Sequence, residues 1–171
     1  MTGPTDTHFP RPAVPRTVTR DEDVEAVVYD LDGTLVRLAV DWAAVERRLA
    51  DLLASEGVEA DELIAAAERE GARQSRRLAL ADAVADHGVP VGICSLNHEE
   101  AVRIALDEHG LTDHVEAVVG RGTVPERKPR PEPLLAAIER LGADPEDVVF
   151  VGDSEGDAEA AERAGTRFEW V

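Results

Sequence analysis

Two carboxylates and a glycine at the end of an apolar run form the part of this sequence best suited to chemistry. The run over residues 24–29 leads into Asp30, Asp32 stands two positions later, and Gly33 follows directly. Side chains two positions apart on a strand point the same way, so the carboxylates converge if the strand continues, and Gly33 permits a sharp turn. A divalent cation would offset their repulsion and bind hard oxygen ligands. The alternative is a solvated Asp-x-Asp-Gly turn, so residues elsewhere must decide.

The net charge limits the partners that such a site can serve. The 171 residues carry 36 acidic and 18 basic side chains, which gives a formal charge of −18 at pH 7. This charge repels polyanions and anionic lipids, so we expect neither a nucleic-acid nor a membrane partner. The sequence has one cysteine, Cys94, and neither a long apolar span nor a signal peptide. We therefore expect a cytoplasmic protein without disulfides, of ordinary single-domain size.

Lysine is almost absent from the chain. Lys128 is the only lysine among the 18 basic residues, and all the others are arginine. Together with the acidic excess, this composition resembles proteins of salt-loving microbes and predicts a haloarchaeal source, because molar salt shortens the screening length to about 3 Å. The alternative is an acidic mesophilic protein from a GC-rich genome. In either case, the one retained lysine is a candidate site residue, because an ammonium and a guanidinium are not interchangeable.

The pattern of apolar runs predicts the element types and the fold class. Residues 1–22 are rich in proline and lack periodicity, so we expect a disordered N-terminal arm. From residue 24 onward, short valine-rich runs alternate with helical stretches, which is typical of a parallel α/β sheet. The expected strands are 24–30, 89–95, 115–119, 148–153 and 166–170. Helices are expected from Asn97 as a capping residue to Gly110, over 134–141 and over 158–164, and the fold class is a Rossmann-like three-layer α/β/α domain.

The segment 41–75 is longer than a crossover between two parallel strands requires. Trp42, Val45 and Leu49 lie on one helical stripe that Gly57 ends, and a second helical run begins near Asp61. We expect this run to continue to about residue 87, its last part covering the sheet. A crossover needs only about a dozen residues, so the excess predicts a small helical cap over 41–75, inserted into a core of residues 23–40 and 76–171. The alternative is a plain helical crossover.

Polar residues stand where the predicted strands end, which is where open parallel sheets bind ligands. Asp30 ends the first strand, Ser95 the second and Asp153 the fourth, while Lys128 follows the third. In this order the segments resemble the haloacid dehalogenase superfamily, specifically its phosphatase-like branch, which includes phosphoglycolate phosphatases. The matching motifs are Asp30-x-Asp32-Gly33-Thr34, the strand-end Ser95, Lys128-Pro129, and Gly152-Asp153 followed by Asp157.

The resemblance implies Mg²⁺-dependent hydrolysis of a small-molecule phosphomonoester. Asp30 is then the nucleophile that forms an aspartyl phosphate, and Asp32 is the acid and base. Ser95 and Lys128 stabilise the transferring phosphoryl group. The implied phosphate-binding residues are Thr34, Ser95, Leu96, Asn97 and Lys128. The implied metal ligands are Asp30, Asp153, Asp157 and, through its backbone carbonyl, Asp32.

Several alternatives stay open at the level of sequence. Asp32 disfavours halide displacement, but a phosphomutase would share every motif, and a non-enzymatic binding protein on the same fold would predict a damaged site. Phosphoglycolate and sugar phosphates are the substrates that the resemblance suggests, although the cap is shorter than the usual four-helix cap. Arg121, Arg127 and Arg130 could contact substrate, but solvated side chains are the default expectation. The oligomeric state cannot be read from the sequence.

Overall fold

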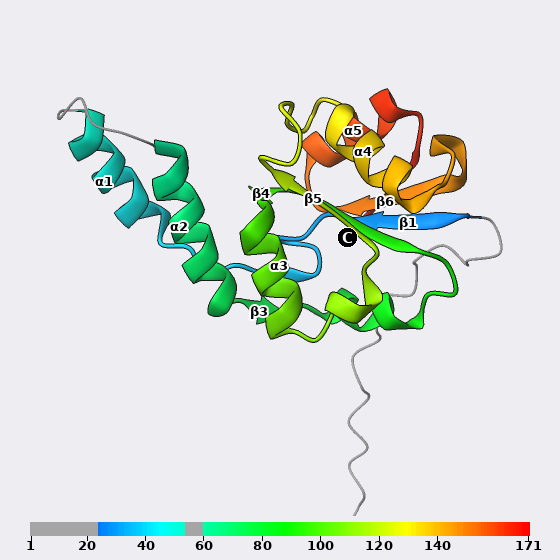
Figure 1. Ribbon diagram of the computed structural model, residues 1–171, viewed down its shortest axis with the longest axis horizontal. Coiled ribbons are helices and arrows are strands. Elements are labelled where there is room, and N and C mark those ends of the chain that lie inside the picture. The colour runs from blue at the N-terminus through cyan, green and yellow to red at the C-terminus, as the bar shows by residue number, and fades with distance from the viewer. Residues whose placement is uncertain (1–23, 54–59) are drawn as a thin grey trace, which may run out of the picture.

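A parallel five-stranded sheet organises the computed structural model, which describes residues 24–53 and 60–171 (Figure 1). Its strands are β1 (Ala26–Tyr29), β4 (Val91–His98), β5 (Ala117–Arg121), β6 (Val148–Gly152) and β7 (Arg167–Trp170). They lie in the order β5-β4-β1-β6-β7, and every neighbouring pair is parallel. The chain moves outward from β1 to β5 and then crosses to β6 on the other side of β1. Open sheets of this kind bind ligands beyond the carboxyl ends of their strands, at the point where the strand order reverses, and Asp30 lies at that end of β1.

Helices cover both faces of the sheet, and alternate side chains of β1 supply both cores. Val27 and Tyr29 are buried in one hydrophobic cluster, whereas Ala26 and Val28 are buried in the other. The first cluster includes residues of α3 (Glu99–Glu108), and the second includes residues of α4 (Glu132–Leu141) and α5 (Glu155–Ala164). In Figure 1, α3 lies on one side of the sheet and α4 and α5 lie on the other. The predicted three-layer α/β fold is confirmed.

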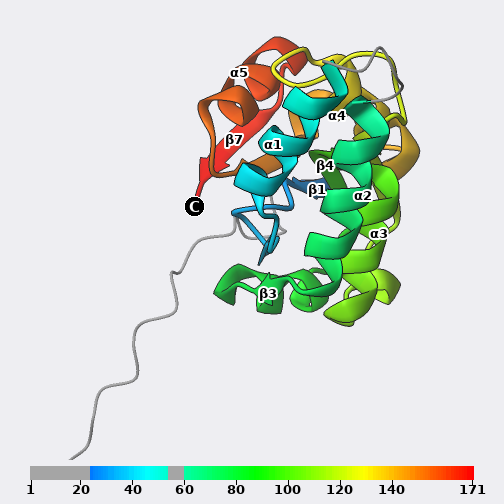
Figure 2. The same cartoon turned by 90° about the vertical axis from the view of Figure 1, so that its left-hand side faces the viewer.

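A pair of helices stands beside this core. α1 (Trp42–Leu53) packs against α2 (Ala60–Arg73), and α2 in turn packs along α3 (Figures 1 and 2). The chain leaves the core through β2 (Val36–Arg37) and returns through β3 (Arg76–Arg77), and these two strands pair antiparallel. None of the described helices is long and apolar enough to cross a membrane. The predicted arm over residues 1–22 and the predicted helix end at Gly57 lie outside the described residues.

The prediction that the second helical run continues to about residue 87 is wrong. α2 ends at Arg73, because the backbone of β3 pairs with β2 and the Leu78 N–H donates to the Leu35 carbonyl at 2.9 Å. A 3-10 helix, η2 (Ala79–Asp86), follows and buries Ala81 and Val84 in the core. Two shorter 3-10 helices are η3 (Thr112–His114) and η4 (Pro145–Asp147).

The helix after β4 begins one residue later than the capping pattern predicts. Asn97 belongs to β4, and the side chain of His98 instead accepts a hydrogen bond from the Glu100 N–H at the start of α3. Asn97 is not available as a cap because its side-chain carbonyl accepts from Ser95. The predicted ends of the later helices are confirmed: α4 and α5 stop at Gly142 and Gly165, both in the left-handed conformation.

Candidate active site

Lys128 is buried where the end of β1, the strand β4 and the start of α5 meet. Its Nζ donates to Asp30 Oδ1 at 2.8 Å, to the Cys94 carbonyl at 2.9 Å and to Asp157 Oδ1 at 2.5 Å. An ammonium has three donors, and all three are used here. Burial alone would lower the pKa of Lys128, but the negative charges of Asp30 and Asp157 outweigh it and raise the pKa, so the side chain stays charged. The only lysine of the chain therefore ties together β1, β4 and the start of α5.

Asp30 follows β1 directly and is almost fully enclosed, with 6% of its surface exposed. Its Oδ1 accepts from Lys128, and Thr34 Oγ1 donates to its Oδ2 over a longer 3.5 Å. Burial raises the pKa of Asp30 to about 6, and the charge of Lys128 opposes that rise. A further positive charge next to Oδ2 would therefore stabilise the ionised carboxylate.

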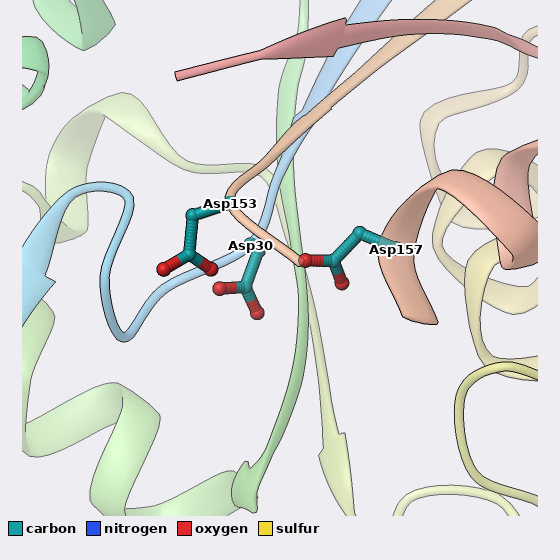
Figure 3. A group of neighbouring side chains, drawn as sticks. All are labelled: Asp30, Asp153 and Asp157. Carbon is teal, nitrogen blue, oxygen red and sulfur yellow. The ribbon is translucent and has the colours of Figure 1, made fainter. Parts of the chain in front are cut away.

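Three carboxylates gather at this point, as Figure 3 shows. Asp30, Asp153 and Asp157 each offer an oxygen, and these oxygens lie within 4.8 Å of one another. Asp153 is exposed, whereas Asp157 is buried and already engaged, because its Oδ2 accepts from the backbone and hydroxyl of Ser154. A set of hard carboxylate oxygens open to solvent on one side fits Mg²⁺, which keeps several waters and binds few protein ligands.

Asp32 is not one of these three grouped carboxylates and has a different environment. It is partly buried, and its Oδ1 accepts from the Leu38 N–H at 3.0 Å. Burial raises the pKa of Asp32, the charges of Asp153 and Glu68 add to the rise, and the Leu38 hydrogen bond opposes it. A carboxyl group with a raised pKa is suited to exchanging protons. The Asp32 side chain is not part of the group of carboxylates that could hold a metal ion.

Ser95 and Asn97 lie in the last part of β4, where a bulge between Cys94 and His98 makes its pairing with β5 irregular, and residues 95–98 are called the β4 loop below. The Ser95 hydroxyl donates to Asn97 Oδ1 at 3.1 Å, and the Asn97 backbone N–H donates to Ser95 Oγ at 3.2 Å. Both residues are buried, whereas the intervening Leu96 is 49% exposed. The Lys128 ammonium donates to the carbonyl of Cys94, the residue directly before Ser95, so Lys128 contacts the backbone where the β4 loop begins.

The expectation that Arg121 is solvated is wrong. Its side chain is buried and pairs with Glu68, an acidic residue that sequence reasoning missed. Arg121 is 8% exposed and Glu68 is 2% exposed, and the two form an ion pair of 2.7 Å. Glu68 shares a helical face with the buried Ala65 and Ala72, one turn away on either side. That spacing is the signal that would have revealed it. Arg127 and Arg130 are exposed, as expected.

The comparisons with known proteins identify the family of this chain. Residues 78–171 match the family model described as haloacid dehalogenase-like hydrolase. A phosphoglycolate phosphatase of Cereibacter sphaeroides is 33% identical, with 83% of this chain and 82% of that protein covered. A phosphoglycolate phosphatase of Rhodospirillum rubrum is 40% identical over 52% of this chain, and the match spans only 36% of that protein. The chain belongs to the haloacid dehalogenase-like hydrolase family.

A solved structure shares the fold at lower identity. The crystal structure of a putative phosphoglycolate phosphatase from Lactobacillus plantarum superposes with a TM-score of 0.69. It is 21% identical and is covered over 86% of both chains. At this identity the likeness concerns the fold alone.

Proposed function

We propose that this chain is a Mg²⁺-dependent phosphatase that hydrolyses a small phosphomonoester through an aspartyl-phosphate intermediate. The observation that carries the proposal is the position of Lys128, which contacts the candidate nucleophile Asp30, the carbonyl beside Ser95, and Asp157. One buried cation among these groups offsets part of the negative charge that Asp30 and Asp157 would otherwise present to a phosphate, on a protein whose net charge is −18.

Asp30 and Asp153 would hold Mg²⁺ through carboxylate oxygens and Asp32 through its backbone carbonyl. Asp157 would support the site mainly by fixing Lys128 and the loop at Ser154, since its oxygens already accept hydrogen bonds. The ion would neutralise charge on the phosphate and on Asp30.

The two aspartates would divide the chemistry between them. A carboxylate oxygen of Asp30 attacks phosphorus while the ester P–O bond breaks, and Asp32 gives its proton to the departing oxygen. Asp32 then takes a proton from water, whose oxygen attacks the aspartyl phosphate and releases inorganic phosphate. The raised pKa of Asp32 suits the first step, because it favours a carboxyl group that still carries its proton.

The remaining groups would bind the phosphoryl oxygens. Ser95 and Thr34 supply hydroxyl donors, and Lys128 supplies positive charge. The backbone N–H groups of Leu96 and Asn97 follow Ser95 in the loop at the end of β4. In this arrangement, the Ser95 hydroxyl exchanges its bond to Asn97 for one to phosphate.

The names of the relatives suggest phosphoglycolate as the first substrate to test, with sugar phosphates next. The helices of the proposed cap, residues 41–75, would cover the crevice beside the core of residues 23–40 and 76–171. Two helices enclose less space than a larger cap, so a small substrate is favoured.

A panel of phosphomonoesters assayed at high KCl, with and without Mg²⁺, tests the proposal. We expect Mg²⁺-dependent release of inorganic phosphate that is abolished in Asp30→Asn. Asp113→Asn is the matched control, because Asp113 is an exposed aspartate in η3. Turnover without metal, or full activity in Asp30→Asn, would contradict the mechanism. An isomerised phosphate ester in place of free phosphate would indicate a phosphomutase.

A further inference from the structure

Glu68 of α2 accepts hydrogen bonds from three groups of the core. Its Oε1 accepts from Arg121 at 2.7 Å and from the Asn97 side-chain amide at 3.4 Å. Its Oε2 accepts from the His98 backbone N–H at 2.9 Å. Because the Glu68 side chain is only 3% exposed, these hydrogen bonds take the place of those that its carboxylate would make to water. A single carboxylate thus contacts the loop after Ser95 at two successive residues.

The chemistry of these partners requires an ionised carboxylate at position 68. All three partners are donors, and a carboxylate is an acceptor at both oxygens. The Asn97 amide must therefore turn its NH₂ group toward Glu68, which leaves its carbonyl to accept from the Ser95 hydroxyl at 3.1 Å. A glutamine would have to place an NH₂ group against a donor, in either orientation.

Arg121 completes the same arrangement from the core side. Its NH1 donates to Glu68 and also to the Leu96 carbonyl at 3.2 Å, and its Nε donates to Asp61 Oδ1 at 3.0 Å. Asp61 and Glu68 are seven residues apart on α2, which places them two turns apart on one face. One buried guanidinium therefore holds two turns of α2 against the end of β4.

We propose that Glu68 and Arg121 form a clamp that positions the phosphate-binding loop, so that the placement of α2 sets the geometry of Ser95 and Asn97. The clamp contacts all three residues after Ser95, through the Leu96 carbonyl, the Asn97 amide and the His98 N–H. Both are positioning residues that act on phosphate through the loop. The inference rests on the proposed function, because it assigns the loop to phosphate.

Glu68→Gln tests the clamp, with binding of orthovanadate and of inorganic phosphate in the presence of Mg²⁺ measured by calorimetry. We expect the Kd of both oxyanions, and the KM of the best phosphomonoester, to rise at least about tenfold, because small displacements of binding groups are costly. Glu70→Gln is the matched control, since Glu70 is an exposed acid on the same helix, and its Kd should stay within about twofold of wild type.

Arg121→Lys provides a second test that keeps the charge but loses the planar fork. It should raise the same Kd, and the double variant Glu68→Gln/Arg121→Lys should do no more than the stronger single variant, because both act through one loop. Arg121→Lys also decides the matter if Glu68→Gln does not fold.

Three outcomes would count against the clamp or its foundation. Variants with a lower Tm but wild-type Kd and KM would leave Glu68 and Arg121 with a purely structural role and overturn the clamp. Independent, additive effects of the two substitutions would overturn it as well. A wild-type protein that binds neither oxyanion and turns over no phosphomonoester would instead overturn the proposed function on which the clamp rests.

Discussion

Gly33 lies so close to Asp153 that any side chain at position 33 would displace the Asp153 carboxylate. A Cβ built on Gly33 would stand 2.0 Å from Asp153 Oδ2, and Gly33 adopts a φ of +95°. The turn at Gly33 closes through its N–H, which donates to the Val36 carbonyl at 2.8 Å. The glycine that follows the two aspartates thus serves two purposes: it turns the chain, and it lets a carboxylate from the end of β6 approach the end of β1.

Gly33→Ala should damage the proposed metal site more than the fold. The added methyl group displaces Asp153, so we expect the Mg²⁺ concentration for half-maximal activity to rise about 10- to 100-fold. The positive φ adds a stability cost of about 1–2 kcal/mol. Activity titrated against Mg²⁺, together with urea unfolding, measures both effects.

The matched control for Gly33→Ala is Gly142→Ala. Gly142 has a φ of +70°, and a Cβ there meets nothing within 4 Å. This variant should therefore lose comparable stability while keeping the Mg²⁺ dependence of the wild type. Equal Mg²⁺ dependence in the two variants would mean that the approach of Gly33 to Asp153 has no part in metal binding.

Lys128→Arg should abolish the proposed phosphatase activity although it conserves charge. One nitrogen now makes three hydrogen bonds in a buried site, and a flat guanidinium cannot direct three donors from one atom. We expect kcat to fall about 100-fold or more, measured by release of inorganic phosphate.

The reverse exchange at an exposed position provides the control. Arg47 is exposed on α1, so Arg47→Lys should leave kcat unchanged. If Lys128→Arg were as active as Arg47→Lys, the retention of a single lysine in this chain would have no catalytic explanation.

The sequence predicted the parallel sheet because valine-rich strands buried on both faces leave a local signal. It predicted the meeting of Asp30 and Lys128, 98 residues apart, because the carboxyl ends of parallel strands converge at one edge. The first inference needed only the apolar runs, whereas the second also used the family resemblance of Lys128-Pro129 and the absence of any other lysine.

The parts that sequence reasoning missed depend on tertiary contacts. β2 and β3 are two residues each and contain three arginines, so no apolar alternation reveals them. Leu78 and Leu80 continue a helical spacing after α2 has ended, because the backbone there pairs with β2 and Leu35 instead. The pairing of Glu68 with Arg121 joins residues 53 positions apart, and charge alone does not distinguish a buried arginine from a solvated one.

Cys94 should be chemically inert in the folded protein. It is fully buried, and burial raises the pKa of its thiol to about 12. At pH 8 the reactive thiolate is therefore scarce, and we expect a thiol reagent such as DTNB to react at a rate set by unfolding. The control is the same reaction in denaturing urea, which should be fast; an equally fast reaction without urea would contradict the burial of Cys94.

The same shift gives a pH dependence of stability with a definite sign. The pKa of the Cys94 thiol is higher in the folded protein than in the unfolded chain, where it is near 9.0. Below pH 9 the thiol is protonated in both states, so its titration does not change the free energy of unfolding. Between pH 9 and about pH 12 the unfolded thiol loses its proton first, and stability should fall. Cys94→Ser should remove this part of the alkaline loss, which urea unfolding at pH 8 and pH 10 would detect.

Salt should stabilise this protein, because its charges repel one another. With 36 acidic and 18 basic residues, the folded state concentrates a net charge of −18, and KCl at about 1 M shortens the screening length to ~3 Å. We expect the Tm to rise by roughly 5 °C between low salt and about 2 M KCl. The control is the same titration near the isoelectric pH of about 4.5, where the net charge vanishes and the rise should become much smaller. A Tm that falls with KCl at pH 7 would contradict the halophilic prediction, and an equal rise at both pH values would assign the effect to salt acting on apolar burial.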